Sequence, residues 1–101
     1  MASRFELRFA NYFLKQFDNY NEKEKRIIND KLALIEENPF RFDKHEGFKF
    51  VFKVKITVDD KFSRLMYAVF FPDAEHITIL GIFDRKSEYK DFERMYNEFR
   101  K

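Results

Sequence analysis

Residues 48–57 read Phe-Lys-Phe-Val-Phe-Lys-Val-Lys-Ile-Thr, and apolar and polar side chains alternate along most of this stretch. Successive side chains of a β-strand point to opposite faces of the sheet. The alternation therefore predicts a long strand with an apolar core face and a basic face. The expected core face holds Phe48, Phe50, Phe52, Val54 and Ile56. The expected basic face holds Lys49, Val51, Lys53, Lys55 and Thr57.

Two further strands are expected after this one. Residues 62–71 are apolar on both faces beyond Arg64, which is typical of a central strand that is covered on both sides. Residues 77–83 form a third apolar run. The expected connections are a turn at residues 58–61 and a type I turn at Pro72-Asp73. Together these segments predict an antiparallel β-meander.

Two helices are expected before the meander. The first has phenylalanines at every fourth position, namely Phe9, Phe13 and Phe17. The second begins at a capping box formed by Asn21 and Glu24 and ends at Asn38-Pro39. Its apolar stripe consists of Ile28, Leu32 and Ile35. A short polar break between the helices predicts an antiparallel helical hairpin.

Both ends of the chain carry shorter signals. Residues 4–9 alternate as a short strand does, although the run also fits an early helix. Ser87 is a suitable N-cap for a last helix, whose apolar stripe is Tyr89, Phe92, Tyr96 and Phe99. The sequence thus predicts one α+β domain over residues 1–101. In it, a helical hairpin packs on a meander of three or four strands, and a C-terminal helix partly covers the other face.

The composition narrows the class of protein. The chain has 101 residues, 15 phenylalanines and no cysteine, and glycine and proline number two each. Scarce glycine and proline favour regular elements with short connections. The lack of cysteine excludes disulfides and thiolate metal sites. No apolar run reaches the length of a bilayer-spanning helix, so we expect a cytoplasmic protein without membrane contact.

Charge is unevenly distributed along the chain. The formal net charge is only +2. Residues 41–64 hold seven basic and four acidic side chains, an excess of three positive charges, whereas residues 1–40 are balanced and residues 65–101 carry one negative charge. A polyanionic partner is therefore expected to bind the middle segment.

Four segments share their order and spacing with a known toxin family. They are Asn-Pro-Phe-Arg-Phe (38–42), Phe-Lys-Val-Lys (52–55), Ser-Arg-Leu-Met-Tyr (63–67) and Ile-Leu-Gly-Ile-Phe-Asp-Arg-Lys-Ser-Glu-Tyr (79–89). In this order they resemble the RelE/ParE toxin superfamily, and the predicted helical hairpin fits the rest of that fold. The resemblance covers about half of the chain.

The resemblance to the RelE branch implies a function and a set of residues. Such proteins are the toxins of type II toxin-antitoxin systems and cut messenger RNA in the ribosomal A site. They use two lysines on the first meander strand, an arginine on the next, an arginine after the last strand and a tyrosine near the C terminus. The matching positions here are Lys53, Lys55, Arg64, Arg85 and Tyr89.

Four more basic residues are candidates for contacts with RNA phosphates, namely Arg41, Lys44, Lys49 and Lys86. Lys86 adjoins Arg85, and either side chain fits the arginine position. The alternative for lysines that alternate on a strand is a solvated face that discourages edge pairing. For Tyr89, the alternative is packing in the core. Arg64 interrupts an apolar strand, and a buried cation needs a partner.

The chemistry expected of this set is attack of the RNA 2′-hydroxyl on the adjacent phosphate. Crowded positive charge favours the neutral form of a lysine, which is the form that accepts a proton. A guanidinium binds two phosphate oxygens at once, which suits Arg64 and Arg85 to a phosphorane. Tyr89 is a candidate proton donor or base-stacking residue. No acidic pair or His/Asp cluster indicates a metal, so no metal or cofactor is expected, and His45 and His76 are expected to be surface residues.

Three functions stay open from the sequence. The first is the ribosome-dependent endonuclease, which the lysine pair with Arg64 favours. The second is a ParE-like toxin that binds DNA gyrase and cuts nothing. The third is a catalytically inactive relative that acts by binding. The resemblance also implies a cognate antitoxin protein as partner, and the sequence leaves the oligomeric state open.

Overall fold

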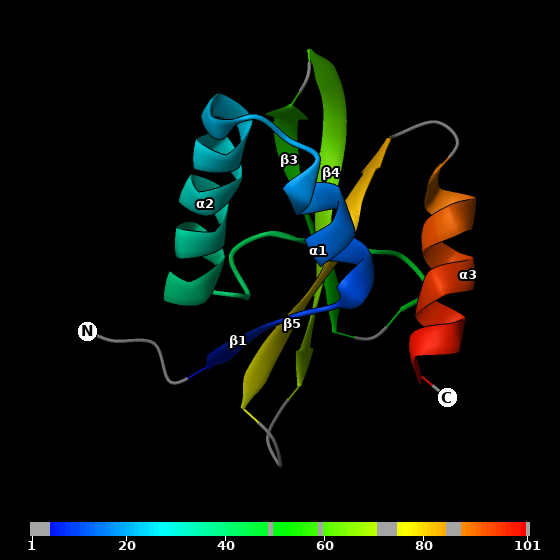
Figure 1. Ribbon diagram of the computed structural model, residues 1–101. Coiled ribbons are helices and arrows are strands. Elements are labelled where there is room, and N and C mark those ends of the chain that lie inside the picture. The colour runs from blue at the N-terminus through cyan, green and yellow to red at the C-terminus, as the bar shows by residue number, and fades with distance from the viewer. Residues whose placement is uncertain (1–4, 49, 59, 71–74, 85–87, 101) are drawn as a thin grey trace.

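The computed structural model describes residues 5–48, 50–58, 60–70, 75–84 and 88–100. Six side chains of the last range lie outside this description: Glu88, Tyr89, Asp91, Glu98, Phe99 and Arg100. In chain order the elements are β1 (Glu6–Phe9), α1 (Asn11–Asp18), α2 (Glu22–Glu37), β2 (Asp43–Lys44), β3 (Val51–Val58), β4 (Lys61–Phe70), β5 (His76–Asp84) and α3 (Glu88–Arg100) (Figure 1).

One five-stranded sheet has the order β1-β5-β4-β3-β2. Strands β3, β4 and β5 form the predicted antiparallel meander, and β1 is the predicted short strand, which pairs in parallel with β5. The edge strand β2 was not predicted, because two residues are too few for an alternating pattern. It pairs with β3 at Phe52 and Lys53.

Helix α2 begins and ends where the sequence predicts. The side chain of Asn21 accepts a hydrogen bond from the Glu24 backbone N–H, and the Glu24 carboxylate accepts one from the Asn21 backbone N–H. These bonds satisfy two N–H groups that a helix start leaves without partners. The helix ends at Glu37, before Asn38-Pro39.

Two apolar clusters hold the helices on the sheet. On one face, α1 and α2 contribute Phe13, Ile28, Leu32 and Ile35, which pack against strand residues that include Phe52, Val54 and Tyr67. On the other face, α3 contributes Phe92 and Tyr96, which pack with Val51, Met66, Ala68, Leu80 and Phe83. Figure 1 shows α2 and α3 on opposite sides of the sheet, as predicted for the helical hairpin and the last helix.

The predicted start of the long strand was wrong. Strand β3 begins at Val51, and Phe50 has a backbone φ of 62°. This left-handed conformation ends the alternation of faces. As a result, Phe48 packs with Phe92 and Tyr96 on the α3 side, rather than on the face that holds Phe52. Lys49 lies outside the described residues, as do Pro72-Asp73 and Ser87.

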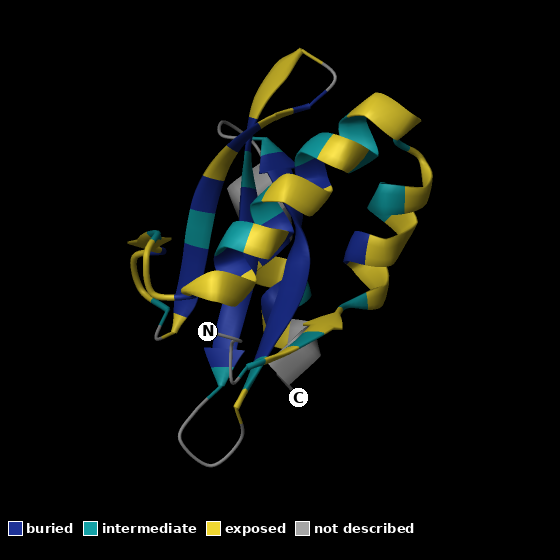
Figure 2. Cartoon of the chain, turned by 90° about the vertical axis from the view of Figure 1, so that its left-hand side faces the viewer, coloured by how far each residue is buried: buried dark blue, intermediate teal, exposed yellow. Residues whose placement is uncertain are grey.

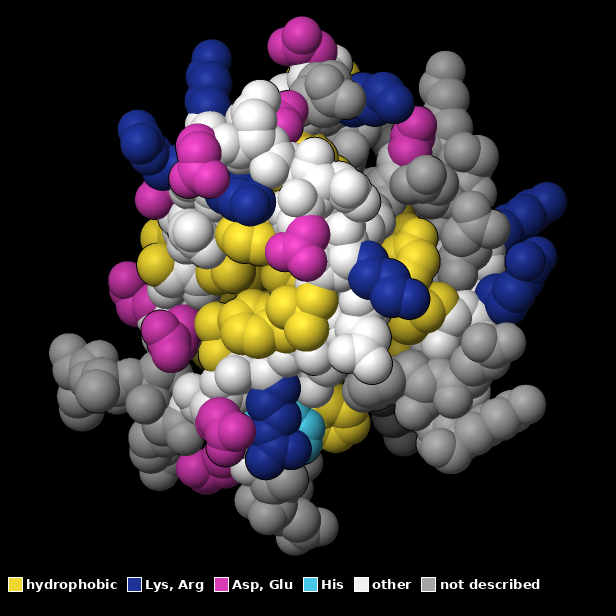
Figure 3. Space-filling model, viewed as in Figure 1, with side chains coloured by type: hydrophobic (Ala, Val, Ile, Leu, Met, Phe, Trp, Pro, Cys, Tyr) yellow, Lys and Arg dark blue, Asp and Glu magenta, His cyan; other side chains and the backbone are white. Residues whose placement is uncertain are grey.

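Helix α1 covers the edge of β5 that β1 leaves open. Pairing between β1 and β5 ends at Phe9 and Ile79, and the Ala10 backbone N–H then donates to the Ile79 carbonyl at 2.9 Å. In Figure 1, α1 lies in front of β5. The same view in Figure 3 shows hydrophobic side chains gathered among charged ones on this side of the molecule.

In the part of the chain that the structure describes, no helix has the length and apolar character needed to cross a bilayer.

Candidate functional site

Lysine and arginine side chains meet on the face of the sheet that α3 partly covers. In the register of β3 and β4, Lys55 lies opposite Arg64 and Lys53 lies opposite Met66. Residues that are opposite on antiparallel strands share a face, and Met66 belongs to the apolar cluster under α3. Lys55 is exposed, whereas Lys53 and Arg64 are half-buried. The structure therefore brings together three residues that the sequence predicts to act together.

These side chains line a groove of about 630 Å³. Its walls are Lys31, Arg41, Phe42, Asp43, Lys53, Val54, Lys55 and Arg64. The groove lies where β2 ends, since among the described residues β2 covers the outer edge of β3 only at Phe52 and Lys53. Arg41, a predicted RNA contact, thus joins the predicted catalytic residues.

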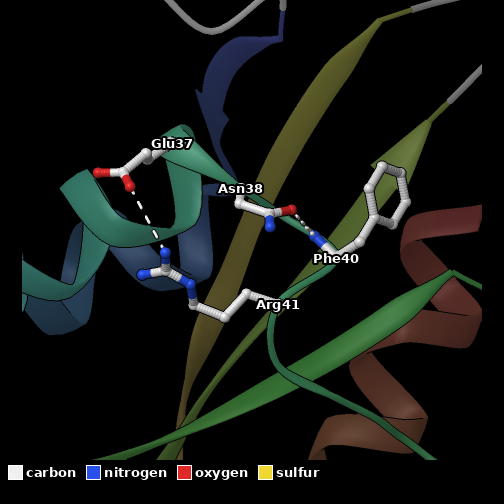
Figure 4. Close-up of polar contacts among 4 residues, drawn as sticks. All are labelled: Glu37, Asn38, Phe40 and Arg41. Atoms are coloured by element: carbon white, nitrogen blue, oxygen red, sulfur yellow. Dashed lines mark hydrogen bonds and ion pairs between the residues drawn. The ribbon is translucent and has the colours of Figure 1, made fainter. Parts of the chain in front are cut away.

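The segment that carries Arg41 is fixed to the core on one side of the groove. The buried Tyr67 hydroxyl donates a hydrogen bond of 2.6 Å to the Pro39 carbonyl, and burial raises the pKa of this phenol. The Phe40 backbone N–H donates to the Asn38 side chain at 3.2 Å (Figure 4). The ring of Phe40 meets Phe52 edge to face at a centroid distance of 5.8 Å. The wall of the groove at Arg41 is therefore held by β3 and β4.

Arg41 also contacts an acidic residue of α2. Its Nη2 lies 3.4 Å from Glu37 Oε1, and both side chains are substantially exposed (Figure 4). An exposed ion pair of this kind contributes little to stability. It orients the guanidinium toward α2, and a phosphate would compete with Glu37 for it.

The charge of the groove favours an anion. Arg64 Nη1 donates to the Ser63 carbonyl at 3.3 Å. Among the described residues, no carboxylate lies within ion-pair distance of Lys55 or Arg64. The described side chains that line the groove include five basic residues and one acidic residue, Asp43. The residues described also contain no group of three or more His, Asp or Glu side chains that would hold a metal ion.

Lys31 is a wall residue that no sequence pattern indicated. It lies on α2, half-buried, one position before the core residue Leu32. In the sequence it is one of many charged residues on that helix, and its place beside Lys53 and Lys55 depends on how α2 packs on β3. An apolar stripe predicts the buried face of a helix, but it does not indicate which neighbouring lysine borders a groove.

Lys44, a predicted RNA contact, is not brought to the groove. Lys44 lies opposite Phe52, on the face away from Lys53, and is not among the lining side chains. Lys49, Arg85 and Lys86 lie outside the described residues, and so does the side chain of Tyr89.

The expectation of a surface position was wrong for His45. Its side chain is buried, stacks on Phe48 at a centroid distance of 5.3 Å and meets Phe92 edge to face at 5.2 Å. Burial, and then the positive charge of Lys53, lower the pKa of His45, while Glu93 acts in the opposite direction. His45 thus connects the segment before β3 to α3. Its burial depends on α3, which supplies Phe92, and a pattern within one segment does not predict that contact.

His76 is half-buried at the start of β5 and stacks on Phe70 at a centroid distance of 4.5 Å. Burial is the main cause that lowers the pKa of His76, followed by Arg8. It lies opposite Phe70 at the far end of β4 from Arg64, so it is not part of the groove.

Solved structures with the same fold are toxins and toxin-antitoxin complexes. A mutant of the E. coli toxin RelE in the free state is 20% identical, with a TM-score of 0.69 over 97% of this chain and 94% of that one. A chain of the intact E. coli RelBE toxin-antitoxin complex is 18% identical, with a TM-score of 0.66 over 81% of this chain and 98% of that one. The archaeal RelE-RelB complex from Pyrococcus horikoshii gives 18% identity and a TM-score of 0.60 over 82% and 97%.

No protein-family model matches the sequence, and no curated protein matches it either. The likeness therefore lies in three-dimensional structure. The element order, the mixed sheet and the C-terminal helix agree with these toxins over nearly their whole length. This chain has the RelE toxin fold.

Proposed function

We propose that this chain is the toxin of a type II toxin-antitoxin pair and that it cuts messenger RNA at the ribosome. The observation that carries the proposal is the position of Lys55 opposite Arg64, with Lys53 two residues along the same strand, in one open groove. The fold is compatible with this activity but does not imply it, because one fold can serve several functions.

Each cation has a task in the proposed reaction. The amine of Lys53 or Lys55 accepts the proton of the 2′-hydroxyl, and Lys55, which lies opposite Arg64, also contacts the phosphate that Arg64 binds. The 2′-oxygen then bonds to the adjacent phosphorus, and the bond from phosphorus to the 5′-oxygen breaks. Arg64 stabilises the charge of the crowded phosphorane with its planar guanidinium. The products are a 2′,3′-cyclic phosphate and a 5′-hydroxyl.

The 5′-oxygen needs a proton as it leaves. We assign this task to Tyr89 and a second phosphate contact to Arg85, as the resemblance implies. Strand β5 ends at Asp84, which lies opposite Ser63, next to Arg64 in sequence. Arg85 follows Asp84 directly. These two assignments rest on the resemblance, because Arg85 and the side chain of Tyr89 lie outside the described residues.

Lys31 and Arg41 extend the positive wall beyond the reacting phosphate. Phosphate contacts of this kind position a nucleic acid without reading its sequence. The small net charge of +2 predicts weak affinity for free RNA. Dependence on the ribosome fits this charge, because the ribosome would supply the rest of the binding surface.

We also propose a cognate antitoxin as partner. Two of the structures with this fold are complexes of RelE with RelB. An antitoxin that occupies the groove or displaces α3 would lower the population of active toxin as its concentration rises above its Kd.

The experiment is a translation reaction with purified protein and a defined message. Wild type is expected to cut the message only while it is translated. Lys53→Ala/Lys55→Ala and Arg64→Ala are expected to leave the message intact while their circular dichroism spectra match wild type. Lys23→Ala, a matched change on the exposed face of α2, is expected to cut like wild type.

Other outcomes would replace the proposal. Intact messages together with stalled DNA gyrase would favour a ParE-like toxin. Intact messages and active gyrase would favour an inactive binding protein. If the Arg64→Ala protein cuts the message at the wild-type rate, the groove is not the catalytic site.

A further inference from the structure

Phe62 is the most exposed of the large apolar side chains that the structure describes. It exposes 78% of its surface, whereas Phe9, Tyr12, Leu14, Phe40 and Phe50 expose between 39% and 45%. A single exposed apolar residue is common on protein surfaces. Phe62 is notable because it lies close to the cations of the groove.

Phe62 lies on the same face of the sheet as Lys55 and Arg64. It is opposite Thr57, and the next pair on this face is Lys55 opposite Arg64. Lys55 and Phe62 are therefore diagonal neighbours, which lie about 7–8 Å apart in antiparallel sheets. Arg64 and Phe62 are two residues apart on one strand, about 7 Å by strand geometry. The ring thus stands one residue pair away from the proposed phosphate-binding pair.

The end of the β3–β4 hairpin leaves this ring accessible. Among the described residues, pairing of β4 with β5 ends at Ser63 and Asp84, and Lys61 and Phe62 pair with β3. Figure 2 shows the hairpin projecting past the helices, with exposed residues at its end. The apolar residues of the α3-side cluster lie farther down the strands, from Val51 and Met66 onward.

The neighbours of Phe62 on this face favour a nucleobase over an apolar protein surface. Among the strand residues that the structure describes they are Thr57, Lys55 and Arg64, so within these residues the ring is not part of a contiguous apolar patch. Proteins that bind single-stranded RNA combine cations that hold the backbone with aromatic rings on which bases stack. Phe62 beside Lys55 and Arg64 has this arrangement.

We propose that Phe62 stacks on a base of the bound RNA strand, next to the phosphate that Lys55 and Arg64 hold. The inference rests on the proposed function and adds a contact to the same site. Stacking on phenylalanine accepts any base, because every base has a π-face. Phe62 would therefore contribute affinity and hold one nucleotide in place, without selecting a sequence.

The test measures binding of a short single-stranded 2′-O-methyl RNA, which lacks the attacking 2′-hydroxyl, by fluorescence anisotropy. A matched probe has the same length and backbone but abasic positions. Phe62→Ala is expected to weaken binding of the base-bearing strand about 5- to 150-fold and to leave binding of the abasic strand unchanged. Phe62→Tyr keeps an aromatic face and is expected to bind like wild type. Leu14→Ala, which removes an exposed apolar side chain on α1, is the control and is expected to bind both strands like wild type.

Each of the following results would overturn the inference. Equal binding by Phe62→Ala and wild type would show that the ring makes no contact with RNA. Equal weakening on both probes would show that its role is not stacking. A wild-type dimer that Phe62→Ala converts to monomers in sedimentation, without loss of RNA affinity, would assign the ring to a protein contact. If Lys55→Ala loses binding and Phe62→Ala does not, the proposed function is supported and the stacking role of Phe62 is contradicted. If wild type binds neither probe, with or without ribosomes, both the proposed function and the stacking role of Phe62 are contradicted.

Discussion

The side-chain amide of Gln16 pairs with the backbone of Ile82 as a neighbouring strand would. The amide nitrogen donates to the Ile82 carbonyl at 2.8 Å, and the amide oxygen accepts from the Ile82 N–H at 2.7 Å. Among the described residues, strand β1 pairs with β5 from His76 to Ile79, and Gln16 covers part of the edge of β5 that follows Ile79. This bidentate contact attaches α1 to the end of β5 that lies beside Ser63 and Arg64.

Gln16→Leu is expected to destabilise the fold by about 1–3 kcal/mol, because a half-buried N–H and C=O both lose their partners. Urea unfolding followed by circular dichroism measures the change. Asn19→Ala removes an exposed side-chain bond to the Lys15 carbonyl and should cost clearly less. If the two changes lower the free energy of unfolding equally, Gln16 has no special role at the edge of β5.

Gly81→Ala should also destabilise the protein, because α1 packs directly on this glycine. A Cβ at Gly81 would lie 2.9 Å from Tyr12 Cδ1 and 3.0 Å from Gln16 Oε1. Such overpacking typically costs about 1–3 kcal/mol. In a Tyr12→Ala background the same change should cost less, since one of the clashing groups is gone. An equal cost in both backgrounds, measured by thermal unfolding, would contradict this packing.

His45 is expected to make the fold less stable in mild acid. Its pKa is lowered by burial first and by Lys53 second, against opposing effects of Glu93 and Glu46. The pKa is thus lower in the folded chain than the value of 6.5 expected when unfolded. Its stabilising contribution is therefore present above pH 6.5 and is lost as pH falls through the folded value.

The measurement is the free energy of unfolding from urea titrations at pH 7, 6 and 5. His45→Gln should lose less stability over this range than wild type, whatever its stability at pH 7. The pKa of His76 is lowered as well, so His76→Gln should reduce the same slope independently. A slope in His45→Gln equal to that of wild type would mean that His45 does not titrate differently in the two states.

The meander and its register could be predicted because they depend on local signals. The turn between β3 and β4 is short, and Val58 lies opposite Lys61. Counting back along both strands places Lys55 opposite Arg64, since register on a hairpin is set by its turn. The alternation of side chains then places both residues on one face. For this reason the core of the candidate site was visible in the sequence.

The remaining parts depend on contacts between distant segments. Lys31 reaches the groove because α2 packs on β3, and β2 exists because residues 43–44 meet an edge that β3 leaves open. The positive φ of Phe50 reverses the expected side for Phe48, and His45 is buried against Phe48 and Phe92. None of these positions follows from a periodic pattern, which describes one element at a time.

The central claim is that Lys55 and Arg64 hold the same phosphate, and a double-mutant cycle tests it most directly. The measurement is the Kd of a single-stranded 2′-O-methyl RNA for wild type, Lys55→Ala, Arg64→Ala and the double variant, with ribosomes added if free RNA binds too weakly. We predict that each single change weakens binding and that the double change weakens it by less than the product, with a coupling of about 0.5–3 kcal/mol. Single effects that multiply without coupling, or single changes that leave the Kd unaltered, would contradict the claim.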